Sequence, residues 1–267
     1  GANGPLLVVA TLPSEGTFAL SAAASDAKGT GAPSAAVSVY YNKTAPNPPA
    51  ALDAATLPGG HIGLTWQAPA GKIPSSYNVY RNANETALSS GVVPSPSLRV
   101  KSGVTGTAAD DLPPQDGLFY YGVTSLDLSG NESGLSNVAP GASDRVIPTA
   151  AVAFLDTTPP LGPGTHSVRL TLSKILAAPP LLTFTPNGQG PLTIALTASS
   201  PTVWVGTLTV ASAMASGTGA FAFEGMDFAG NVGHAITSGG TSLLDTTPPS
   251  GSVVLNPASP VKAGQVA

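Results

Sequence analysis

The chain of 267 residues contains no cysteine, and only 9% of its residues are charged. The absence of cysteine excludes disulfides, thiolate nucleophiles and cysteine-ligated metals. An ordinary globular chain is about a quarter charged, so this one lacks the basic surface that nucleic acids require and the charged faces of helical bundles. No run of 18 apolar residues is present, so the sequence predicts no membrane-spanning helix.

Signatures of common catalytic sites are also absent. The chain has no Gly-x-Ser-x-Gly elbow, no His-Glu-x-x-His and no Gly-x-x-x-x-Gly-Lys. A nucleophile needs a base held beside it, but His61, His166 and His234 are scattered, and Asp110 and Asp111 lie in a Pro-rich loop without a second acidic cluster. We therefore predict a protein that is not an enzyme and whose histidines bind no zinc.

What is abundant is Gly (31 residues), Pro (27) and hydrophobic residues (42%). Short segments alternate apolar and polar residues, as at Ile62, Leu64 and Trp66, and breaks containing Gly or Pro follow about every ten residues. This rhythm predicts an all-β fold of tandem sandwiches in an elongated array. The residues predicted to face inward include Trp66, Tyr121, Val123, Trp204, Leu208 and Phe223.

Two motifs recur along the chain. Residues 155–160 and 244–249 both read Leu-Asp-Thr-Thr-Pro-Pro, and residues 42–49 hold a degenerate copy. Because paired prolines can continue neither a helix nor a central strand, we interpret them as stiff linkers between compact units. Residues 127–131 and 227–231 share the form Asp-x-x-Gly-Asn, which favours a capped turn in a β-hairpin; residues 25–30 are a weaker relative.

These residues carry a resemblance to known families. Residues 46–143 resemble a fibronectin type III domain through Pro-x-Pro-Pro at 46–49, Leu-Thr-Trp at 64–66, Tyr-Asn-Val-Tyr-Arg at 77–81 and Tyr-Gly-Val-Thr-Ser-Leu-Asp at 121–127. Residues 157–245 resemble the bacterial immunoglobulin-like repeats of large secreted and surface proteins through the motifs at 227–231 and 245–249. One departure is a longer interval between the two motifs after residue 131 than after residue 231, which leaves an extra segment near residues 143–149.

The expected domains follow from these motifs. They are the C-terminal part of an immunoglobulin-like sandwich at 1–45, a fibronectin type III-like sandwich at 46–156, an immunoglobulin-like sandwich at 157–247 and the first strands of another at 248–267. Isolated terminal strands would expose an apolar face and unpaired edges. Either the sequence is a window on a longer array, the interpretation we favour, or another chain supplies the missing strands by strand addition.

Asp156 and Asp227 are the candidate metal ligands. In an immunoglobulin-type sandwich the incoming linker and the turn between the last two strands lie at the same end. The two carboxylates could then meet and bind Ca²⁺, which prefers oxygen ligands, and the resemblance raises this expectation. The alternative is that Asp227 caps its own turn and Asp156 caps the bend at residues 157–158. No other cofactor is predicted.

Aromatic residues offer a weaker signal for a binding surface. Trp66 and Trp204 share the parity of aliphatic neighbours, which favours core packing over sugar stacking. Residues that could face outward and form an aromatic patch are Tyr40, Tyr41, Tyr80 and Tyr120.

The sequence as a whole predicts a non-catalytic spacer or adhesion stalk of an extracellular or cell-surface bacterial protein. Two alternatives remain open: accessory modules of an extracellular enzyme that bind carbohydrate or protein, and a filament subunit assembled by strand exchange. The expected partners are neighbouring modules of the same or an identical chain, surface polysaccharide or another extracellular protein. Neither nucleic acid nor membrane insertion is expected.

Overall fold

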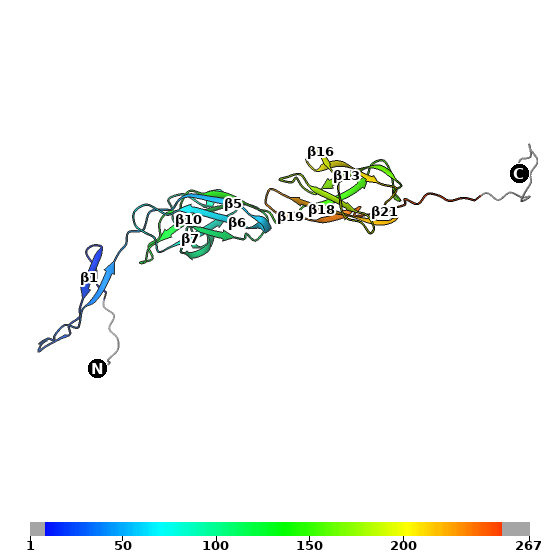
Figure 1. Ribbon diagram of the computed structural model, residues 1–267. Helices are drawn as coiled ribbons and strands as arrows, with labels where there is room; N and C mark the ends of the chain where they lie inside the picture. Colours follow the sequence, from blue (N-terminus) through cyan, green and yellow to red (C-terminus); the bar gives the residue numbers. More distant parts are fainter. Residues whose placement is uncertain (1–8, 253–267) are drawn as a thin grey trace, which may run out of the picture. The chain divides into compact units, whose positions relative to one another are not determined.

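The computed structural model describes residues 9–252. The chain divides into two compact units, Gly1–Asp144 and Arg145–Ala267, whose described residues form β-strands (Figure 1). Among residues 9–252 there are also three short 3₁₀ helices, all in the first unit. The all-β class expected from the alternating sequence is therefore confirmed. Most of residues 248–267, where the first strands of another sandwich are expected, lies outside the described residues.

The first unit begins with an antiparallel ribbon. Strand β1 (Gly16–Leu20) pairs with β4 (Val37–Tyr41), and the short strands β2 (Ser25–Asp26) and β3 (Gly29–Thr30) form a second hairpin between them. Phe18 lies opposite Val39 and Leu20 opposite Val37, so apolar side chains share one face. Val37 is nevertheless 65% exposed. Within residues 9–45, the ribbon therefore presents an apolar face to solvent.

A β-sandwich follows the ribbon. One sheet has the order β5-β6-β9 and the other β11-β10-β7-β8. Ile62, Leu64 and Trp66 on β6 are buried while Thr65 is exposed, as the alternation predicts. The strands are β5 (Ala50–Thr56), β6 (Ile62–Gln67), β7 (Ser76–Asn82), β8 (Arg99–Val104), β9 (Ala108–Asp111), β10 (Gly117–Leu126) and β11 (Ala139–Ser143). The 3₁₀ helices are η1 (Pro58–Gly60), η2 (Glu85–Ala87) and η3 (Pro96–Leu98).

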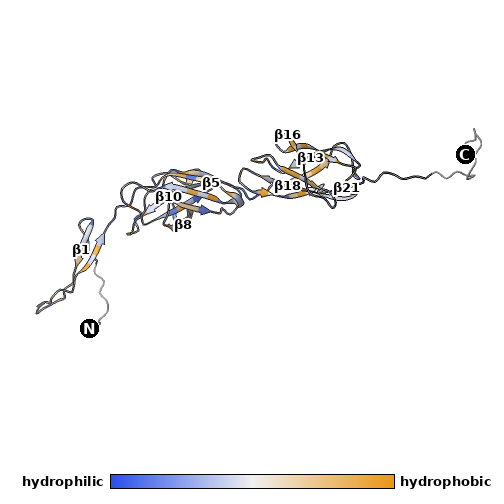
Figure 2. Ribbon diagram, in the orientation of Figure 1, coloured by the Kyte–Doolittle hydropathy of each residue, from blue (hydrophilic) through white to orange (hydrophobic). Residues whose placement is uncertain are grey.

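The second unit is a larger sandwich. One sheet has the order β16-β17-β13-β12-β20, and the other has the order β15-β14-β18-β19 with β21 also paired to β18. Phe184 and Phe221 meet at the centre of its core with ring centroids 4.7 Å apart, and Figure 2 shows hydrophobic residues recurring along these strands. The strands are β12 (Thr149–Phe154), β13 (Gly164–Leu172), β14 (Leu181–Thr185), β15 (Leu192–Thr193), β16 (Leu196–Ser200), β17 (Val203–Val210), β18 (Gly217–Met226), β19 (Val232–Gly233), β20 (Ala235–Ser238) and β21 (Thr241–Leu244).

The boundary between the sandwiches differs from the sequence expectation. The second unit begins at Arg145, not after residue 156, because β12 pairs with β13 and β20 of that unit. The longer interval after residue 131 therefore contains β12, and the extra segment near residues 143–149 is the connection from β11 to β12. Pro159 and Pro160 consequently belong to the second unit. There the chain passes from β12 in one sheet to Leu161, whose backbone bonds to Leu243 and Asp245 beside the other sheet. The pair Pro159–Pro160 is therefore not a linker between units; its prolines occupy a crossing between sheets where no ladder N–H is needed.

Candidate functional site

The two Asp-x-x-Gly-Asn motifs form nearly identical turns. Asp127 Oδ1 accepts hydrogen bonds from the backbone N–H groups of Ser129 (2.8 Å) and Asn131 (2.9 Å). Asp227 Oδ1 accepts from those of Ala229 and Asn231, both at 2.9 Å. The glycine of each turn has a positive φ, 83° at residue 130 and 82° at residue 230, which other residues adopt with strain. The predicted turn-capping role of Asp227 is therefore confirmed.

A lysine completes each turn. Lys72, in the loop after β6, donates to Asp127 Oδ2 at 2.6 Å and to the carbonyl of Thr44 at 2.7 Å. Lys174, in the loop after β13, donates to Asp227 Oδ2 at 2.7 Å and to the carbonyl of Val146 at 2.9 Å. We call each set of lysine, aspartate and carbonyl a lysine clamp. In both sandwiches, the clamp ties the segment that precedes the first strand to the turn that follows the long strand β10 or β18.

The first clamp has additional polar contacts. Asn42 Nδ2 donates to Asp127 Oδ2 at 2.6 Å, and Asn131 Nδ2 donates to the carbonyl of Asn42 at 3.0 Å. Glu15 holds the same segment from the ribbon, since its carboxylate accepts from the backbone N–H of Lys43 and the hydroxyl of Thr44, both at 2.7 Å. The chain between β4 and β5 is therefore fixed at successive residues.

The aspartates of both clamps are buried, with side chains only 3% and 2% exposed. Burial alone raises the pKa of each carboxyl, but hydrogen bonds from the lysine and the asparagine outweigh this effect. The pKa of Asp227 is therefore below its ordinary value, and that of Asp127, which also accepts from Asn42, is well below it. Both groups are carboxylates at neutral pH and form ion pairs with their lysines.

The structure does not bring Asp156 and Asp227 together. Asp156, which is exposed, accepts from the backbone N–H of Ser167 at 2.9 and 3.1 Å and does not bond to residues 157–158. It follows the end of β12, whereas the clamp of Asp227 contacts Val146 before that strand begins. A six-residue strand spans roughly 20 Å. No group of three or more acidic or histidine residues within 9–252 is arranged to hold a metal ion.

Two other carboxylates, one buried and one half-buried, belong to polar clusters that sequence reasoning missed. Asp111 accepts from Arg81 (2.6 Å) and from the hydroxyl of Tyr121 (2.9 Å), and burial followed by this contact raises the pKa of Tyr121 strongly. Arg81 shares the parity of inward-facing Tyr77 and Val79, and a charge at such a position requires a buried partner; that was the available signal. Glu132 forms the second cluster, accepting from Asn78 (2.9 Å), Tyr80 (2.6 Å) and Thr124.

The tryptophans, Tyr80 and the histidines considered from the sequence are not part of either clamp. Trp66 is 5% exposed and belongs to the first core, as predicted; Trp204 is partly buried against the second. Tyr80, expected as an outward-facing candidate, is fully buried against Leu88 and Leu135 because β7 is covered on both faces. His61 contacts Asp110 (2.8 Å), His166 the carbonyl of Gly162 (2.9 Å) and His234 lies 3.9 Å from Glu224.

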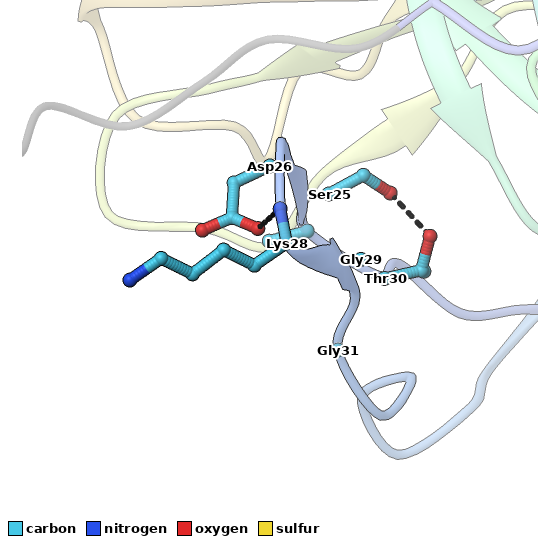
Figure 3. Close-up of a pocket in the computed structure, with 7 residues that line it drawn as sticks. Ser25, Asp26, Lys28, Gly29, Thr30 and Gly31 are labelled. Carbon is cyan, nitrogen blue, oxygen red and sulfur yellow. Dashed lines mark hydrogen bonds between the residues drawn. The ribbon is translucent and has the colours of Figure 1, made fainter.

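The surface hollow at the tip of the ribbon contains few groups that could act as catalysts or metal ligands. It has a volume of about 410 Å³ and is lined by small and polar residues between Ala24 and Gly31 (Figure 3). The backbone N–H of Lys28 donates to Asp26, and the hydroxyls of Ser25 and Thr30 bond to each other. This lining contains no histidine and no second carboxylate. Among residues 9–252, no helix is long and apolar enough to cross a membrane.

Comparisons with known proteins find similar structures but no matching family model or curated sequence. Similar solved structures include the FN1–FN3 domains of chicken CNTN1 (10% identity, 82% of this chain and 72% of that one, TM-score 0.37) and a 1.5-MDa bacterial ice-binding adhesin (17%, 79% and 68%, TM-score 0.36). A third is a tetra-tandem repeat in the extending region of a large adhesion protein (16%, 74% and 50%, TM-score 0.30). At these scores the comparisons assign no function to the chain.

Proposed function

We propose that the chain is a non-catalytic spacer in an extracellular or cell-surface protein. Its sandwiches transmit force along the chain and hold an active or adhesive part at a distance. The low charge and the high content of Gly and Pro agree with this proposal, as does the resemblance of residues 46–143 to fibronectin type III domains and of residues 157–245 to repeats of large secreted and surface proteins.

The observation that carries the proposal is the repeated lysine clamp. A spacer must pass tension from the incoming chain into a folded body without unravelling its first strand. Each clamp joins the incoming backbone to a buried carboxylate through an ammonium group, at Thr44 in one sandwich and at Val146 in the other. Hydrogen bonds to charged groups are about twice as strong as neutral ones, so they suit this task.

The buried and half-buried ionised groups of the first sandwich support the same function. Arg81 and Asp111 bond to each other, and the carboxylate of Glu132 is occupied by hydroxyl and amide donors. Each group therefore joins strands of the first sandwich: Arg81 on β7 bonds to Asp111 on β9, and Glu132 bonds to residues of β7 and β10. We infer that these groups serve the stability of that sandwich.

Single-molecule pulling between the two ends of the chain tests this function. Each sandwich contains about 100 residues, which when extended add at most about 3.3–3.6 Å each. We expect two unfolding events per molecule, each releasing roughly 30 nm of chain. Extension without resolved force peaks would overturn the proposal, because modules that yield without resistance cannot keep a distal part at a fixed spacing under load.

A further inference from the structure

Each lysine clamp places a positive charge between a carboxylate and a backbone carbonyl oxygen. In the second sandwich these groups are the carboxylate of Asp227 and the carbonyl of Val146, each within 2.9 Å of Lys174 Nζ. In the first they are the carboxylate of Asp127 and the carbonyl of Thr44, each within 2.7 Å of Lys72 Nζ. Carboxylate and backbone carbonyl oxygens are also the ligands that bind Ca²⁺ in proteins.

We propose that Lys72 and Lys174 are positioning residues that take the place of a metal ion and fix the incoming chain to each sandwich without calcium. The inference deepens the proposed spacer function and rests on it for its biological meaning. An ammonium group has three donors and no acceptor, so one lysine can satisfy the carboxylate and the carbonyl at the same time.

The geometry is specific because it arises from different local sequences. Lys72 lies five residues beyond the end of β6, whereas Lys174 lies two residues beyond the end of β13. The bonded carbonyls likewise precede β5 and β12 by different numbers of residues. Both loops nevertheless deliver the lysine to the same pair of partners. This shared endpoint is what a positioning role requires, since an ordinary surface lysine makes no fixed set of contacts.

Burial explains why the lysine cannot be lost without effect. The aspartate side chains are at most 3% exposed, so water cannot readily replace the ammonium group. With methionine in its place, the carboxylate and the carbonyl would face each other without a cation between them. The ammonium group is the cationic contact between the incoming segment and the turn, so its loss should weaken the attachment of that segment to the turn.

Amide hydrogen exchange on the intact chain tests the proposal, with Lys174→Met and Lys72→Met as variants. We expect exchange at residues 145–147 to accelerate about tenfold in K174M, while strand β13 keeps its protection. In K72M the acceleration at residues 43–45 should be smaller, because Glu15 and Asn42 also hold that segment, and strand β6 should keep its protection. Lys174→Arg retains the charge and should restore much of the slow exchange. The matched control is Lys101→Met on β8, since Lys101 forms no ion pair among residues 9–252.

A second arm needs no variant. Adding Ca²⁺ or a chelator to the wild-type chain should leave exchange at both segments unchanged. Faster exchange in chelator would show that a metal holds the chain and would overturn the proposal, as would unchanged exchange at residues 145–147 in K174M. If K174M fails to fold, the wild-type arm and K174R still decide the question. The pulling experiment can fail while these results stand, so the two proposals are tested separately.

Discussion

Replacing Trp66 by phenylalanine should change stability much less than replacing it by alanine. The side chain is 5% exposed, packs in the first core and meets Tyr77 edge-to-face with ring centroids 5.4 Å apart. Its indole N–H, however, is buried and finds no acceptor among the described residues. The native side chain therefore combines favourable packing with an unpaired donor, and the two substitutions separate these contributions.

The magnitudes follow from that geometry. Trp66→Ala removes the packing and leaves a cavity, which costs about 3–5 kcal/mol. In a sandwich of about 100 residues this lowers Tm by more than roughly 10 °C. Trp66→Phe loses about 1–2 kcal/mol of apolar burial. It also removes an unpaired N–H whose burial costs about 1–3 kcal/mol. We therefore expect the phenylalanine variant to lie between about 1 kcal/mol less stable and about 2 kcal/mol more stable than wild type.

Urea unfolding of the intact chain, followed by a probe in the first sandwich, measures both values. The partly buried Trp204 has the same unpaired indole in the second sandwich, so Trp204→Phe provides a parallel measurement with the first sandwich unchanged. If Trp66→Phe destabilised the chain as much as Trp66→Ala, the indole N–H would have to make a favourable contact, and the reasoning would be refuted.

Two further predictions concern acid and packing. Because the pKa of Asp127 and that of Asp227 are lower in the folded state, their stabilising contribution is complete above the ordinary value of about 3.8 and is lost as the pH falls below it. Stability should therefore fall with pH below about 4, less steeply in Asp227→Asn; an unchanged slope would argue against the ion pair. Gly122→Ala should cost about 1–3 kcal/mol, because the added Cβ would lie 2.5 Å from side-chain atoms of buried Leu135, and calorimetry showing wild-type stability would contradict this contact.

The parts of the fold that the sequence predicted are those governed by local patterns. Alternation placed Ile62, Leu64 and Trp66 on the inner face of one strand, and Asp-x-x-Gly-Asn identified two turns whose aspartates cap them. Both features depend on residues within a few positions of each other. Tyr80 shows the limit of such reasoning, since alternation assigns it to an outer face that a separate cluster around Leu135 covers.

The clamps and the domain boundary depended on contacts between distant segments. Lys174 reaches Asp227, 53 residues away, and no pattern around either residue identifies the other. The place of Pro159 in the fold could not be predicted from its motif either. Residues 155–160 match residues 244–249 in sequence, but the first copy follows β12 and the second begins at the end of β21. The candidate site was thus half accessible from the sequence: Asp227 was identified, but its partner is a lysine and not the expected carboxylate of Asp156.

The central claim is that each sandwich, with its own clamped incoming segment, is a separately folding body. Scanning calorimetry of the intact chain and of fragments 42–144 and 145–247 tests this claim most directly, since each fragment retains its clamp. The account predicts that each fragment melts cooperatively and that the two heat-capacity profiles add up to that of the intact chain. A fragment that fails to melt cooperatively, although the intact chain does, would contradict it.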